Sequence, residues 1–63
     1  MKKLIGSAPT LAQLEALIQK YFYSPYIIDP NTNLIMQVNG GPSDLNDSFV
    51  VVYLKGRFRF ERR

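Results

Sequence analysis

The chain has 63 residues, of which 46% are hydrophobic, 13% aromatic and 21% charged. This composition is typical of one small folded domain and excludes a disordered tail, although so short a chain can build only a small core. Cysteine and histidine are both absent, which excludes disulfides and the usual zinc ligands, and the net charge of +3 comes mainly from basic residues near the two chain ends.

Residues 1–6 contain two lysines and a short apolar pair. Because Gly6 follows directly after Leu4 and Ile5, this segment lacks the long apolar core of a signal peptide. The longest apolar run, residues 49–54, is too short to cross a bilayer as a helix. We therefore expect a soluble, cytoplasmic protein with no membrane contact, in which residues 1–6 form either an edge strand or a flexible arm.

Apolar residues recur at helical spacing between positions 11 and 22. They fall on one side of a helix and are Leu11, Leu14, Leu17, Ile18, Tyr21 and Phe22. Thr10 is a suitable N-cap, with Gln13 three residues later as its capping-box partner. Ser24-Pro25 ends the helix, because proline disfavours the helical conformation of the residue before it. This pattern predicts one helix with a single buried stripe.

Short apolar runs separated by turn residues follow the helix, which is typical of strands. Residues 26–28 and 34–38 flank Asp29–Asn33, a sequence that suits a hairpin turn. Glycine and polar residues then predict a flexible loop running on to about Asp47.

The last third of the chain predicts a second hairpin. Residues 48–54 and 57–62 are two strand-like runs, and Lys55-Gly56 lies between them. The expected fold is α+β, with a single N-terminal helix packed on one face of a three- to four-stranded antiparallel β-meander. Residues 1–63 then form one domain.

The sequence offers no catalytic, cofactor or metal site. Without His or Cys, a nucleophile has no obvious base beside it, and the five carboxylates are scattered along the chain. Asp29–Asn33 resembles the opening of an EF-hand calcium loop, but Leu34 and Gly40 occupy the positions that need glycine and glutamate. We therefore expect no enzyme, no metal, no cofactor and no small-molecule substrate.

Residues 49–54 are apolar throughout, so a strand there places apolar side chains on both faces of its sheet, whereas one helix covers only one face. Two registers are open. A two-residue turn at Lys55-Gly56 turns Val50, Val52 and Leu54 away from the helix, and a three-residue loop turns Phe49, Val51 and Tyr53 away instead. The first register is favoured because it places more aromatic side chains in the core.

An exposed apolar stripe of this kind typically marks an interface. We therefore expect a non-enzymatic binding module that acts through an open sheet face, either as a homodimer or on another protein. The predicted contact residues are Val50, Val52 and Leu54.

Nucleic acid is the alternative partner, because residues 55–63 carry five cations and one anion. Arginines that alternate with phenylalanines along a strand can contact a phosphate backbone. The candidate residues are Lys55, Arg57, Arg59, Arg62 and Arg63.

Overall fold

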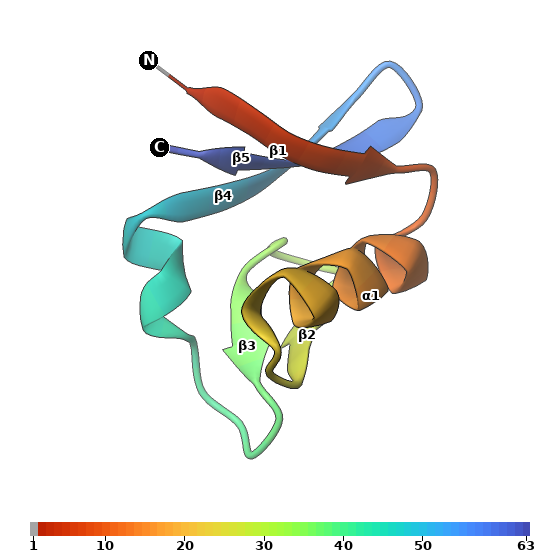
Figure 1. The fold of residues 1–63 in the computed structure, drawn as a ribbon. Helices are drawn as coiled ribbons and strands as arrows, with labels where there is room; N and C mark the ends of the chain where they lie inside the picture. The colour runs from red at the N-terminus through yellow and green to blue at the C-terminus, as the bar shows by residue number, and fades with distance from the viewer. Residues whose placement is uncertain (1) are drawn as a thin grey trace.

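The computed structural model describes residues 2–63. Over that range it contains one α-helix, five strands and one short 3-10 helix (Figure 1). In chain order these are β1 (Lys3–Ala8), α1 (Leu11–Phe22), β2 (Tyr26–Ile28), β3 (Ile35–Gln37), η1 (Asp44–Asp47), β4 (Phe49–Leu54) and β5 (Arg57–Arg62). Within residues 2–63, no helix has both the length and the apolar character needed to span a membrane.

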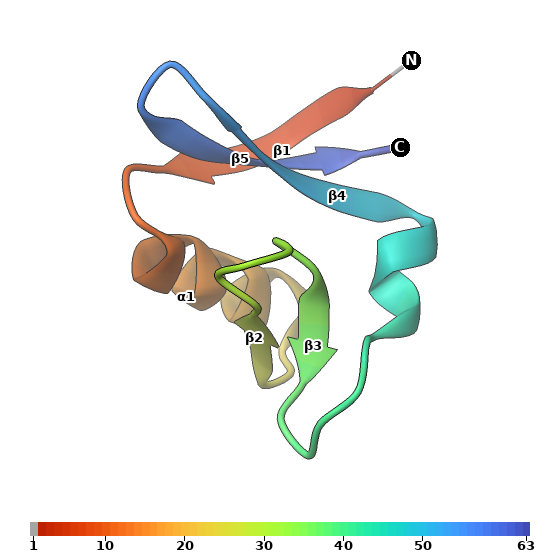
Figure 2. The same cartoon turned by 180° about the vertical axis from the view of Figure 1, so that it is seen from behind.

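The strands form two separate antiparallel sheets. One sheet has three strands in the order β1-β5-β4, and the other is a ribbon of β2 and β3. Figures 1 and 2 show the three-stranded sheet as one layer and α1 with the β2–β3 ribbon as the second. The predicted α+β class, with one helix packed against an antiparallel sheet, is confirmed. The strands do not form one continuous meander, however, because the ribbon lies beside the helix.

The N-terminal segment contributes an edge strand. β1 pairs with β5 on the side opposite β4, so Gly6 faces Phe60 across the sheet, and the register shifts between Leu4 and Gly6. From Lys3 onward, the segment 1–6 therefore forms the strand and not the arm. Met1 lies outside the described residues.

Local signals define both ends of α1. Thr10 has an extended backbone, and its Oγ1 accepts a hydrogen bond from the Gln13 backbone N–H at 3.2 Å. The threonine hydroxyl in turn donates to the Gln13 side-chain oxygen at 3.3 Å. At the other end, Tyr23 adopts a left-handed conformation with φ 54°, and its N–H donates to the Gln19 carbonyl. Pro25 follows, and the predicted helix boundaries are confirmed.

Two polar side chains of α1 fix the ribbon beside the helix. The Glu15 carboxylate accepts from the Ile28 N–H at 2.7 Å, and the Gln19 amide donates to the Tyr26 carbonyl at 2.7 Å. Helix residues four apart lie on one side, and strand residues two apart direct their backbone groups to one edge. The outer edge of β2 is therefore occupied by the helix, which explains why the ribbon does not extend the larger sheet.

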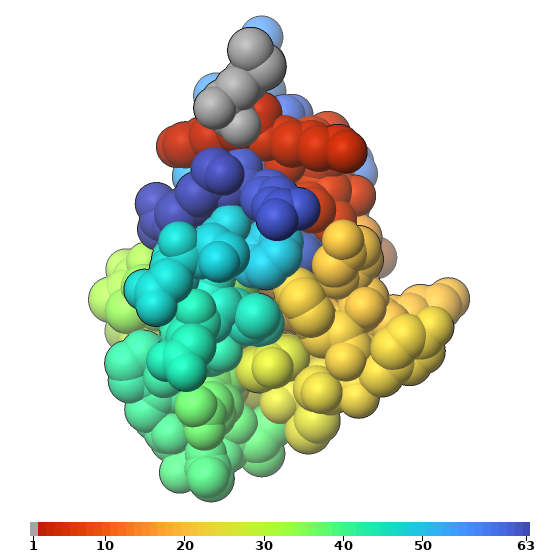
Figure 3. All heavy atoms as spheres, turned by 60° about the vertical axis from the view of Figure 1, so that its left-hand side comes forward, coloured from red at the N-terminus to blue at the C-terminus, as the bar shows by residue number. Residues whose placement is uncertain are grey.

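The outer edge of β3 is occupied by a side-chain amide. Asn46 Oδ1 accepts from the Ile35 N–H, and its Nδ2 donates to the carbonyls of Ile35 and Ser43, all at 2.9 Å. The predicted flexible loop thus contains the ordered turn η1, where the Ser43 hydroxyl caps the Leu45 N–H. In Figure 3 the turquoise η1 region fills the side of the molecule between blue β5 and the green ribbon.

The core lies between the two layers. Its buried apolar residues are Ala8, Leu14, Ile18, Ile28, Ile35, Val51 and Phe60. Phe60, on the central strand, is fully buried and stacks on Phe49 with ring centroids 5.1 Å apart. Phe22 packs edge-on against Phe49 at 5.3 Å and against Phe60 at 6.0 Å. Helix, ribbon and sheet therefore meet in one core.

Candidate interaction surface

The turn between β4 and β5 decides which side chains face outward. Lys55 and Gly56 have φ values of 54° and 80°, and Leu54 pairs directly with Arg57. Two consecutive positive φ angles are typical of the two-residue type I′ turn, whose twist matches the strands that it joins. The favoured two-residue register is therefore the one observed.

This register directs Phe49, Val51 and Phe60 toward the helix and ribbon. Val51 is only 4% exposed and lies opposite Phe60. Tyr53 shares the same side of β4 but remains 58% exposed, with its ring 4.7 Å from that of Phe58 near the hairpin tip. The expected packing of aromatic side chains in the core thus holds for the middle of the strands and ends before their tip.

The opposite side of the three-stranded sheet is the outer sheet face. It carries Val50, Val52 and Leu54 from β4, Glu61, Arg59 and Arg57 from β5, and Leu4 and Ser7 from β1. In Figures 1 and 2, α1 and the ribbon both lie below the sheet. Among the described elements, none covers the outer sheet face.

An ion pair with a nearly buried carboxylate lies on the central strand of the outer sheet face. Arg59 Nε donates to Glu61 Oε2 at 2.7 Å, and the Glu61 side chain is only 11% exposed. Glu61 sits on the central strand, paired with Leu4 on one side and with Val50 on the other. Its second oxygen, Oε1, accepts no hydrogen bond from residues 2–63 and keeps access to solvent.

The apolar part of the outer sheet face is less open than the sequence suggests. Val50 and Val52 are half-buried and pair across the strands with Glu61 and Arg59 of β5. Leu54 is 52% exposed and Leu4 is 46% exposed. The surface is thus a row of apolar residues beside a row of charged ones.

The five cations of the alternative site do not share one surface. Arg57 and Arg59 belong to the outer sheet face, where Arg57 Nε donates to Ser7 Oγ at 3.2 Å and Arg59 binds Glu61. Both guanidinium groups thus already have partners within the chain.

The other three cations lie elsewhere. Lys55 is in the hairpin turn, and Arg63 Nε donates to the Asn46 carbonyl at 2.8 Å at the opposite end of the sheet. Arg62 lies next to Arg63, and the pairing of β1 with β5 places it opposite Lys3. The basic residues therefore form two groups, one on the outer sheet face and hairpin turn and one near the chain ends.

A second apolar surface was not predicted. On the solvent side of the ribbon, which we call the outer ribbon face, Ile27 is 44%, Leu34 39% and Val38 60% exposed, and Met36 is half-buried. Their neighbours Ile28 and Ile35 point the other way, into the core. The sequence signal for this surface is the same as for β4, namely apolar residues at successive positions in 26–28 and 34–36.

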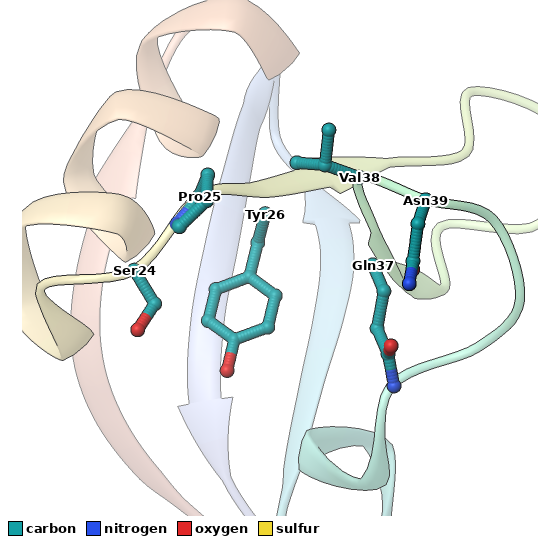
Figure 4. A pocket seen from close by; sticks show the side chains of 6 residues that line it. All are labelled: Ser24, Pro25, Tyr26, Gln37, Val38 and Asn39. Atoms are coloured by element: carbon teal, nitrogen blue, oxygen red, sulfur yellow. The ribbon is translucent and has the colours of Figure 1, made fainter.

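A shallow hollow of about 400 Å³ lies at the end of the ribbon (Figure 4). Its lining residues are Ser24, Pro25, Tyr26, Gln37, Val38 and Asn39. Tyr26 and Gln37 pair across the ribbon, and their side chains point the same way in Figure 4. No charged side chain lines the hollow, so it offers hydroxyl and amide groups but no carboxylate or ammonium group for acid–base chemistry.

The segment that resembles a calcium loop uses its oxygens within its own turn. Asp29 Oδ1 accepts from the Asn31 N–H at 2.9 Å, and the Asp29 carbonyl accepts from the Asn33 N–H at 2.7 Å. Across residues 2–63, no three His, Cys, Asp or Glu side chains are grouped closely enough to hold a metal ion.

Comparisons of the chain with protein-family models, with curated proteins and with solved structures found no match.

Proposed function

We propose that this chain is a non-enzymatic binding module that self-associates through its outer sheet face. The observation that supports this proposal is the row Val50, Val52 and Leu54, which lies on a sheet face that no described element covers. An uncovered apolar surface of this kind is a common feature of protein interfaces. A domain with a small core also gains stability when a second subunit covers one face of its sheet.

The energy available from this row is moderate. A fully buried aliphatic side chain contributes roughly 1.5–3 kcal/mol relative to an exposed one. Val50 and Val52 are already half-buried, so each gains only part of that amount, and Leu54 gains about half. Three such residues on each of two subunits supply several kcal/mol, which only approaches the entropic cost of association, so a stable dimer also needs the polar contacts of the same face.

Sedimentation over a range of protein concentrations tests the proposal. The wild-type chain is expected to change from monomer to dimer in the micromolar range, and Val52→Lys is expected to be a folded monomer because position 52 faces outward. Val51→Lys places the charge in the core and is expected not to fold. A wild-type chain that stays monomeric at high micromolar concentration would refute self-association.

Val38→Lys is the matched control. Val38 is also an exposed valine, but it belongs to the outer ribbon face. The substitution is expected to leave the dimer unchanged. If Val38→Lys abolished the dimer while Val52→Lys did not, the ribbon and not the sheet would be the interface.

Nucleic-acid binding is a second candidate, favoured by the cross-strand pair of Lys3 and Arg62 with Arg63 beside it. Like charges directly opposite one another are unfavourable unless an anion lies near them, and a phosphate could supply it. Binding to a single strand or duplex should then weaken steeply with salt. Arg62→Glu should reduce the slope of the logarithm of the binding constant against the logarithm of the salt concentration by about one unit. The absence of any binding at low salt would exclude this function.

A further inference from the structure

We propose that two copies of the chain pack outer sheet face against outer sheet face, so that Arg57 of each copy binds Glu61 of the partner subunit. This inference rests on the proposed self-association and gives it a defined geometry. Strand β5 then lies over the partner's β5 in the opposite direction, and β4 lies over the partner's β4. The arrangement is a small β-sandwich of two three-stranded sheets.

Charge selects this arrangement from the two that keep the strands of both sheets aligned. Two identical faces that pack together are related by a two-fold axis in the plane between them. An axis parallel to the strands places Arg57 over the partner's Arg57 and Glu61 over the partner's Glu61. An axis across the strands reverses β5, so that each Arg57 lies over the partner's Glu61. Only the second axis joins opposite charges.

The same axis also brings the apolar rows together. Rotation across the strands leaves each strand above its own copy, so Val52 lies over the partner's Val52 and Val50 over the partner's Leu54. The apolar row therefore packs on an apolar row and the charged row on a charged row. Sheets in a sandwich lie within about 30° of one another and about 10 Å apart, a separation that side chains from both faces fill.

Glu61 can accept a second donor. Its side chain is 11% exposed, and Arg59 binds only Oε2, which leaves Oε1 without a partner among the described residues. A carboxylate can accept two arginine contacts, and hydrogen bonds between charged groups are stronger than those between neutral ones. The two-fold axis brings Arg57 of the partner subunit to this oxygen. To bind Glu61, Arg57 gives up its 3.2 Å hydrogen bond to Ser7 Oγ.

Arg59 lies at the axis and faces the partner's Arg59. Each Arg59 is bound to Glu61 of its own subunit at 2.7 Å, which directs the guanidinium along the strand toward the carboxylate. Each side of the dimer thus holds one Glu61 between two arginines, one from each subunit. The two glutamates compensate half of the positive charge of the four arginines, which would otherwise oppose contact between the two faces.

Complementary charge reversal tests the geometry. Arg57→Glu should weaken the homodimer at least tenfold, because two pairs become repulsive, and Glu61→Lys should weaken it by a similar factor. In a heterodimer of the two variants, the glutamate introduced at position 57 lies over the lysine introduced at position 61, and the other pair keeps its native residues. A mixture of the two variants should therefore form a heterodimer within a few-fold of the wild-type affinity. Lys20→Glu is the control for Arg57→Glu, because it also replaces a cation by a glutamate, but on the exposed side of α1. It should leave dimerisation unchanged.

Salt dependence provides an independent test, since Glu61→Lys also removes the partner of Arg59 and could impair folding. The affinity of the wild-type dimer should fall with salt, and Arg57→Gln should flatten that dependence. If the wild type is a dimer and Arg57→Glu dimerises as tightly, the proposed geometry is wrong and self-association stands. If the wild type is a monomer, the proposed geometry and the proposed self-association are both wrong.

Discussion

The close approach of β1 to α1 at Gly6 leads to a quantitative prediction. A Cβ atom at this position would lie 2.7 Å from Leu17 Cδ1 and 3.0 Å from Cδ2, whereas ordinary contacts begin at 3.4 Å. Gly6→Ala therefore forces the Leu17 side chain to retreat by roughly 0.7 Å, the difference between 3.4 and 2.7 Å. Added methyl groups in packed sites typically cost about 1–3 kcal/mol. The contacted atoms are the end of a side chain that can rotate. We therefore expect Gly6→Ala to lower the free energy of unfolding by about 1–2 kcal/mol, in the lower part of that range.

A double-mutant cycle measures this contact directly. Leu17→Ala removes a half-buried side chain, and we expect it to cost about 2–3 kcal/mol. In the double variant, the methyl group at position 6 occupies space that the leucine vacates. The double variant should therefore be more stable than the sum of the single effects predicts, by about 1 kcal/mol. Urea unfolding followed by circular dichroism gives the free energies of unfolding of the wild type, the two single variants and the double variant. If the least stable variant is partly unfolded without denaturant, all four proteins are measured at the same concentration of sucrose, which stabilises the folded state.

Ser7→Ala is the control, because Ser7 is the next residue of β1 and points to the outer sheet face. It loses one exposed hydrogen bond to Arg57 and should change stability by less than about 0.5 kcal/mol. Gly6→Ala with wild-type stability would show that α1 is not held this close to β1. Additive effects of Gly6→Ala and Leu17→Ala would lead to the same conclusion.

Two further predictions concern the core and the closure of the ribbon. Leu14→Ala should cost about 2–4 kcal/mol in thermal or urea unfolding, because Leu14 is fully buried in the helix stripe; a loss below about 1 kcal/mol would show that the helix is not docked in this way. Asn46→Ala should lower the free energy of unfolding by about 1–3 kcal/mol, because it leaves the N–H of fully buried Ile35 unpaired, whereas the Ile35 carbonyl keeps its bond from the Ser43 N–H. Hydrogen exchange at the Ile35 amide should accelerate in that variant, and unchanged protection would contradict the role of Asn46.

Features that depend on neighbouring residues could be predicted from the sequence. The helix begins after Thr10 and ends before Pro25, as capping and proline chemistry require. The tight turn at Lys55-Gly56 was also expected, and it fixes the alternation that buries Val51 and turns Val52 outward. These features follow from interactions between residues close in the chain.

The sequence also indicated that β4 is apolar on both faces, which led to the candidate residues Val50, Val52 and Leu54. It did not indicate that the ribbon has the same property. A short apolar strand has the same pattern whether one face or both are covered, so only the position of the ribbon beside α1 shows that Ile27 and Val38 are exposed.

The tertiary structure decided how these elements are joined. Glu15 was one of several scattered carboxylates in the sequence, yet it binds the Ile28 amide 13 residues away and separates the ribbon from the larger sheet. Glu61 was one anion in a basic tail, and pairing of β5 with strands on both sides made it a nearly buried carboxylate. Local spacing determines helices and turns because their contacts lie a few residues apart. The role of a lone polar side chain depends on which distant backbone or charge the fold brings to it, and the spacing of residues along the chain does not contain that information.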